Sequence, residues 1–158
     1  MTIEIRHATA ADVGILLDLV KALAAYEKQP DAVKATEEDL LRDGFGHERR
    51  FEARLASLDG KPAGFTLFFP DYSTWEGRSS LFLEDIFVAE WARRRGVGRA
   101  LIADLAEIVL ERGWGRLNLN VLNWNPARKF YRALGFEHMK EWLPYRLEGD
   151  ALRRLARG

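Results

Sequence analysis

The chain has 158 residues, in which 24 Lys and Arg balance 24 Asp and Glu, and it contains no cysteine. A formal net charge of zero gives no overall electrostatic attraction to nucleic acid or to a membrane surface. The lack of thiols excludes a cysteine nucleophile, a cysteine zinc site and a disulfide framework. The length predicts a single domain over residues 1–158, and the absence of a signal-like N-terminus or a long apolar run favours a cytoplasmic protein.

The first half of the chain predicts a strand, two helices and a hairpin. Apolar residues recur at helical spacing between Thr9, a cap residue, and Tyr26, and a second capped helix is expected between Thr36 and Gly44. An Asp-Gly pair between two runs of period two is a strong hairpin signal. The predicted segments are strand 3–5, helix 9–26, helix 36–44, strand 51–57, strand 63–69 and loop 70–77.

The second half predicts a parallel strand pair joined by a helix, and then a closing hairpin. The segments expected are strand 81–88, helix 100–110, strand 117–121, helix 126–134, strands 136–140 and 142–147, and a helical turn at 150–156. The fold class is therefore α/β, or α+β, with a mixed central sheet of about seven strands. A ligand is expected at the carboxyl ends of the parallel strands.

The turn between strand 81–88 and helix 100–110 is rich in glycine and arginine. It reads R-R-R-G-V-G-R from Arg93 to Arg99. Two glycines let the backbone approach a ligand closely, and the first turn of the following helix leaves N–H groups unpaired. The turn is thus a candidate phosphate site, although a tight connection with solvated arginines is an alternative.

The pattern R-x-x-G-x-G at Arg93, Gly96 and Gly98 resembles the signature of the GCN5-related N-acetyltransferases, in which this loop holds the pyrophosphate of acetyl-coenzyme A (acetyl-CoA). The predicted element order is that of the same family, so the resemblance covers essentially the whole chain. It implies acetyl-CoA as co-substrate, while the scattered histidines predict no metal. The cofactor contacts it implies are Ile86, Phe87, Val88, Arg93, Arg94, Arg95, Gly96, Val97, Gly98, Arg99, Asn125 and Tyr131.

Residues 130–136 read F-Y-R-A-L-G-F, and from the pattern alone the aromatic pair is more typical of a core than of a catalyst. The resemblance reverses this interpretation, because F-Y-x-x-L-G-F is the second signature of the family. It implies that Tyr131 is the general acid for the coenzyme A thiolate. A phenol with a pKa of about 10 is suited to that proton transfer.

Two acids, Glu84 and Asp85, interrupt an otherwise apolar strand, so one of them must face inward or into a cleft. Burying such acids without partners is costly. Our preferred interpretation is that Glu84 accepts the proton of the amine substrate, directly or through water, and that Asp85 attracts its positive charge. The alternative is that both acids face solvent or arginines at a sheet edge.

Three further segments, at 23–28, 43–45 and 72–78, resemble the diamine branch of the family, which includes spermidine/spermine and thialysine acetyltransferases. Without this resemblance, Tyr26 and Glu27 would be an ordinary helix end. The substrate side that the resemblance implies consists of Tyr26, Glu27, Trp75, Glu84, Asp85 and Glu141.

The predicted function is an acetyl-CoA-dependent N-acetyltransferase that acts by direct attack of a primary amine of a small diamine, polyamine or thialysine-like substrate. The lack of cysteine favours this route over a thiol acyl-enzyme. The alternatives are acetylation of a protein or another metabolite, and a non-catalytic coenzyme A sensor. No nucleic-acid or membrane partner is expected, and the resemblance implies a homodimer.

Overall fold

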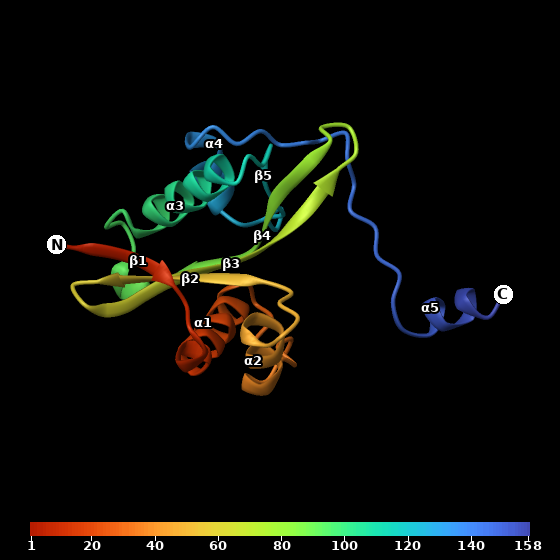
Figure 1. Ribbon diagram of the computed structural model, residues 1–158, viewed down its shortest axis with the longest axis horizontal. Helices are drawn as coiled ribbons and strands as arrows, with labels where there is room; N and C mark the ends of the chain where they lie inside the picture. Colours follow the sequence, from red (N-terminus) through yellow and green to blue (C-terminus); the bar gives the residue numbers. More distant parts are fainter. The chain divides into compact units, whose positions relative to one another are not determined.

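The computed structural model describes residues 1–158, which form two compact units, 1–125 and 126–158 (Figure 1). The single domain expected over the whole chain stays a prediction. The first unit contains β1 (Ile3–His7), η1 (Ala10–Asp12), α1 (Val13–Tyr26), α2 (Glu37–Phe45), β2 (Glu52–Leu58), β3 (Lys61–Ser73), β4 (Arg78–Val88), η2 (Glu90–Ala92), α3 (Val97–Glu111) and β5 (Leu117–Leu119). The second contains α4 (Ala127–Ala133) and α5 (Gly149–Ala156).

The first unit is built on a mixed sheet with the strand order β1-β2-β3-β4-β5. The first four strands are antiparallel to their neighbours, whereas β5 runs parallel to β4, with Leu81 opposite Leu117 and Leu83 opposite Leu119. The helix α3 connects β4 to β5. The expected α/β class and the expected parallel pair are therefore confirmed.

Helices cover both faces of this sheet: α1 and α2 lie on one face and α3 lies on the other (Figure 1). Leu55 of β2 packs with Leu16 of α1, and its neighbour Ala56 packs with Leu101 of α3. This alternation is the one that a strand buried on both sides requires. None of the helices combines the length and the apolar composition needed to cross a membrane.

The two predicted helix caps are present. The backbone N–H of Thr9 donates to Asp12 Oδ2 at 2.7 Å, ahead of α1. At the start of α2, the N–H of Thr36 donates to Asp39 Oδ2 at 2.9 Å, and the N–H of Asp39 donates back to Thr36 Oγ1 at 3.2 Å. Each acid also lies at the positive end of a helix dipole, which is a stabilising position for it.

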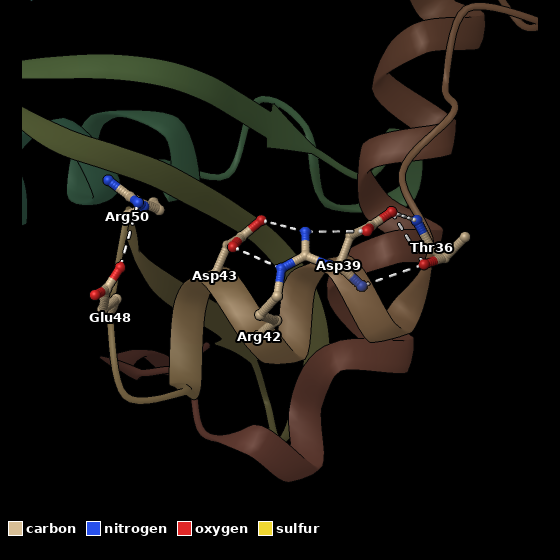
Figure 2. A network of polar contacts seen from close by, with 6 residues as sticks. All are labelled: Thr36, Asp39, Arg42, Asp43, Glu48 and Arg50. Carbon is tan, nitrogen blue, oxygen red and sulfur yellow. Dashed lines mark hydrogen bonds and ion pairs between the residues drawn. The ribbon is translucent and has the colours of Figure 1, made fainter.

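Arg42 extends the cap of α2 into a small network of charges. Figure 2 shows its guanidinium between Asp39 and Asp43. Arg42 Nη2 lies 3.1 Å from Asp39 Oδ1 and 2.9 Å from Asp43 Oδ2. These side chains are well exposed, so the network contributes little to stability. It keeps Asp39 and Asp43 paired within their own helix.

Two bidentate ion pairs fasten α3 to β2. Arg54 donates to Asp104 at 2.8 Å and 2.6 Å, and Arg112 donates to Glu52 at 2.6 Å and 2.7 Å. The Arg54 and Asp104 side chains are only 12% and 14% exposed, so each charge depends on the other. The pairs fix the helix that begins with the glycine turn.

The expected loop 70–77 is wrong in extent. β3 continues to Ser73 and pairs with β4 as far as Arg78, so the connection consists of residues 74–77. The pairing of β2 with β3 ends at Phe68, so beyond that point β3 has a neighbour on one side only. Pro70, which has no N–H to donate, is therefore tolerated in the strand.

The expected count of about seven strands is also wrong, because the sheet has five. Segments 136–140 and 142–147 form no strands, and the N–H of Trp142 donates locally to the carbonyl of Met139 at 3.1 Å. Pro144 removes a donor from the second segment. Leu143 and Tyr145 are 72% and 92% exposed, so the apolar residues of the alternating pattern do not pack against a core.

Replacing Asp104 with alanine should lower the free energy of unfolding by about 3 kcal/mol, because it leaves the guanidinium of Arg54 buried without a partner. Chemical denaturation measures the change. Removing the Glu48 carboxylate, which pairs with Arg50 in an exposed contact, is the matched control and should change stability by less than about 0.5 kcal/mol. Equal effects of the two substitutions would contradict the assignment of a buried pair.

Replacing Thr66 with valine should raise the free energy of unfolding by about 1 kcal/mol. Thr66 is fully buried and its hydroxyl has no hydrogen-bond partner. Valine has the same shape without the unsatisfied polar atom. Thermal unfolding checks the sign, and a lower melting temperature would show that the hydroxyl is satisfied in solution.

Candidate active site

The candidate site begins with an irregularity in β4. Asp85 lies opposite Leu67 of β3 and Leu83 lies opposite Phe68, so Glu84 has no partner across the ladder. Such a β-bulge places one extra residue in a strand and redirects its side chains. The two adjacent acids therefore differ in environment: Asp85 is half-buried, whereas Glu84 is exposed.

Past the bulge, one edge of β4 is open. β5 pairs with β4 only as far as Leu83, so residues 84–88 have β3 on one side and no strand on the other. Gly64 of β3 lies opposite Val88, and a Cβ at Gly64 would lie 2.5 Å from the carbonyl oxygen of Phe87. The open edge can hydrogen-bond an extended ligand as a strand would.

The glycine turn follows this edge. Gly96 caps α3 in a left-handed conformation with φ of +86°, and Arg94 has φ of +61°, which is unusual for a residue with a side chain. The first helical bond is donated by Ala100 to the carbonyl of Gly96 at 3.0 Å. The N–H groups of Val97, Gly98 and Arg99 therefore precede the helical ladder, and this end of a 15-residue helix fits a pyrophosphate.

Three carboxylates, those of Glu27, Glu84 and Asp85, form what we call the acidic cluster. Burial and the charges of Glu84 and Glu27 raise the pKa of Asp85 to about 6. Burial also raises the pKa of Glu27. None of the three forms an ion pair with a lysine or arginine, so the cluster is free to receive a cation.

Aromatic rings lie beside the acidic cluster. The Tyr26 and Phe87 ring centroids are 6.5 Å apart, and the Tyr26 hydroxyl donates to Asn125 Oδ1 at 3.4 Å. The guanidinium carbon of Arg93 lies 4.9 Å from the Tyr26 centroid, and Arg93 Nε donates to the carbonyl of Val88 at 3.0 Å. The structure thus brings together predicted residues from α1, β4, the glycine turn and the segment after β5.

Sequence reasoning missed Trp124. The ammonium of Lys28, directly after Glu27, lies 4.3 Å from the centroid of the Trp124 ring. This contact adds a second link between the end of α1 and the segment that carries Asn125. The sequence signal that could have identified Trp124 was its position next to Asn125, a predicted cofactor contact.

Trp75 lies at a different place in the first unit. It belongs to the turn between β3 and β4 and is 83% exposed. From Arg78, where β4 begins, to Glu84 the strand spans roughly 20 Å. The structure therefore does not bring Trp75 to the acidic cluster, and its role as a wall of the site stays a prediction.

Tyr131 and Glu141 belong to the second unit. The Tyr131 ring packs against Phe130 and Phe136, with centroids 5.4 Å and 5.6 Å away, so α4 and the residue after Gly135 fix its orientation. Glu141 is exposed in a segment without regular structure. The proton-donor role of Tyr131 and the substrate role of Glu141 stay predictions.

The titration of Asp85 tests the acidic cluster directly. Carboxyl NMR should give this group a pKa of about 6, and Glu27→Gln or Glu84→Gln should lower it, because each removes a negative charge. Asp18→Asn, on the exposed side of α1, is the matched control and should leave it unchanged.

The same group predicts a pH dependence of stability. Because the folded state raises the pKa of Asp85 above its unfolded value, its contribution to stability is present below pH about 4 and is lost as the pH rises through about 6. Asp85→Asn should therefore stabilise the protein at pH 8 and not at pH 4. A gain of equal size at both pH values would contradict the raised pKa.

In chemical terms, the first unit combines an open strand edge, a glycine turn with free N–H groups at the start of a helix, and unpaired carboxylates beside aromatic rings. Comparisons with known proteins agree with this combination. The chain is 40% identical to a thialysine N-epsilon-acetyltransferase of Bos taurus, over 98% of this chain and 97% of that protein. It is 32% identical to a spermidine/spermine N(1)-acetyltransferase-like protein of Homo sapiens, over 97% of this chain and 24% of that protein.

Among solved structures, an integron cassette protein from the mobile metagenome of V. cholerae superposes with a TM-score of 0.80 and 28% identity, covering 100% of this chain and 99% of that one. The sequence model of the acetyltransferase (GNAT) family matches residues 16–136, which span the bulge, the glycine turn and α4. The resemblance noted in the sequence is thereby confirmed. The chain belongs to the GNAT family and is an acetyl-CoA-dependent N-acetyltransferase.

Proposed function

We propose that the protein transfers an acetyl group from acetyl-CoA to a primary amine of a small diamine, a polyamine or a lysine-like molecule such as thialysine. The observation that carries the proposal is the acidic cluster, whose three carboxylates have no cationic partner and lie beside the open edge of β4. The thialysine acetyltransferase named above supports the same substrate class.

The co-substrate is assigned to the open edge and the glycine turn. The N–H groups of Val97, Gly98 and Arg99, which precede the helical ladder, would bind its phosphates, and the exposed side chains of Arg94 and Arg95 would add positive charge. Backbone groups of Ile86, Phe87 and Val88 would hold the extended pantetheine arm as a neighbouring strand would. Asn125, which accepts a hydrogen bond from Tyr26, lies at the boundary with the amine side.

Acetyl-CoA supplies the thioester, and the chain supplies the proton transfers. An alkyl ammonium has a pKa of about 10.4, so it must lose a proton before it attacks. Glu84 is assigned as the acceptor, directly or through water, and Asp85 attracts the cation. The bond from nitrogen to the acetyl carbon would form as the carbon–sulfur bond breaks, and the nitrogen would release its second proton to solvent to become the amide. Tyr131 would donate a proton to the departing thiolate and regain one from solvent.

The acidic cluster and the neighbouring rings would select the amine. A long substrate carries a second charged group, and carboxylates together with aromatic faces stabilise such cations. Tyr26, Glu27 and Asp85 supply these groups within the first unit. Glu141 is proposed as a further contact to the distal part of the substrate.

We also assign the protein to the cytoplasm and to a homodimeric state. The support for a dimer is the exposed apolar side chains of the second unit, which include Leu143, Tyr145 and Leu155. Light scattering during gel filtration should give twice the 18.1 kDa of one chain. A mass of 18.1 kDa at micromolar concentration would refute the dimer.

A thiol-release assay tests the function. Acetyl-CoA is incubated with spermidine, putrescine, thialysine, lysine, an aminoglycoside and a histone-tail peptide in turn. Turnover is expected with a small diamine or thialysine, and Glu84→Gln or Tyr131→Phe should lower kcat by about 10² to 10⁴. Glu48→Gln, which removes an exposed carboxylate of the first unit, is the matched control and should leave kcat unchanged.

The outcomes separate the alternatives. Turnover of the peptide alone would replace the small amine with a protein substrate. Tight binding of acetyl-CoA without turnover of any amine would indicate a sensor of the co-substrate. Full activity of both variants would leave the reaction intact and refute the two catalytic assignments.

A further inference from the structure

We propose that Arg93 is a positioning residue for the amine substrate. Its guanidinium holds the Tyr26 ring in place beside the acidic cluster, and it therefore sets the affinity for the amine rather than for acetyl-CoA. This inference rests on the proposed function and deepens it, because it assigns to the first arginine of the glycine turn a role on the substrate side.

The contacts of Arg93 join three parts of the first unit. Its guanidinium carbon lies 4.9 Å from the centroid of the Tyr26 ring and 5.4 Å from that of Phe87. Its Nε donates to the carbonyl of Val88, the last residue of β4, at 3.0 Å. One planar group thus links the end of α1, the end of β4 and the start of the turn, and a lysine could make only part of these contacts.

The backbone separates Arg93 from the phosphate-binding part of the turn. Arg93 is extended, with ψ of 155°, and α3 begins four residues later at Val97. Between them, the left-handed conformations of Arg94 and Gly96 change the direction of the chain. All four arginines of the turn are exposed, but Arg94, Arg95 and Arg99 differ from Arg93 in making no ion pair or ring contact with the chain, which leaves their guanidinium groups available to an anion.

The charge of Arg93 is directed at rings and a carbonyl instead of at carboxylates. If the guanidinium were paired with Asp85, the pKa of that acid would be lowered, whereas it is raised. The acidic cluster therefore keeps its negative charge for an incoming ammonium. Arg93 lies near the cluster without neutralising it.

Tyr26 has few other restraints. The residue is 37% exposed, and its hydroxyl makes one long hydrogen bond of 3.4 Å. Phe87 supports one side of the ring, and Arg93 covers it from the direction of the turn. Without the guanidinium the ring is free to rotate away, and the amine loses an aromatic face that stabilises its charge.

Steady-state kinetics with thialysine as the amine test the inference. Arg93→Met should raise the KM for thialysine about tenfold and change the KM for acetyl-CoA less than about twofold, because methionine fills space without covering the ring as a cation. Arg93→Lys should restore part of the loss. Arg94→Met, in the same turn but without a ring contact, should show the opposite pattern and raise mainly the KM for acetyl-CoA.

A double-mutant cycle with Tyr26→Leu tests whether Arg93 acts through the ring. If it does, Arg93→Met should raise the KM for thialysine less than about twofold once Tyr26 is already leucine. Full additivity of the two substitutions, or a rise confined to the KM for acetyl-CoA, would overturn the inference. Melting temperatures identify any variant that fails to fold, and Arg93→Lys then carries the test.

NMR titration of thialysine against the Tyr26 ring signals separates this inference from the proposed function, because it requires no turnover. Binding in the wild type that weakens about tenfold in Arg93→Met supports the role of Arg93 even if the assay shows no reaction. Equal binding to both proteins overturns it even if the wild type acetylates thialysine. If the wild type neither binds nor acetylates any amine of the panel, the proposed function and this inference are both wrong.

Discussion

The candidate site depends on one constraint: β4 has two neighbours up to Leu83 and only one after it. Its backbone groups beyond that point are left for a ligand, because β5 ends and the bulge at Glu84 shifts the register. The glycine turn follows the same open segment directly. The open edge, the two acids and the start of α3 therefore come from one continuous stretch of chain, and the order of the strands places the end of α1 beside it.

Charged residues in the first unit serve two separate purposes. Arg54 with Asp104, and Arg112 with Glu52, are bidentate pairs that hold α3 on the sheet. The acidic cluster has no such partners, and burial together with the charges of Glu84 and Glu27 raises the pKa of Asp85. A chain with equal numbers of acidic and basic residues thus forms a local negative site, because no lysine or arginine forms an ion pair with the three acids of the cluster.

Much of the fold could be predicted from the sequence, because caps, periodicity and turn residues are local signals. The caps at Thr9 and Thr36, the Asp-Gly hairpin and the parallel pair flanking α3 all follow from them. The bulge at Glu84 could not be predicted, since it is a mismatch between two strands and leaves no mark in either. The prediction of two closing strands was wrong for a related reason. The alternating pattern in residues 136–147 is compatible with a strand, but a strand forms only where a partner strand and an apolar face to cover are present. The contact of Arg93 with Tyr26 spans 67 residues of sequence and likewise has no local signal.

Gly64 has a consequence that reaches beyond its own strand. It admits the backbone of β4 at a distance that no side chain would allow, at the point where the open edge ends. Gly64 therefore allows a close approach of β3 and β4 on the side of β4 opposite its open edge. A side chain at this position would have to displace the backbone of β4 next to its open edge, so the geometry of that edge depends on a residue that does not belong to it.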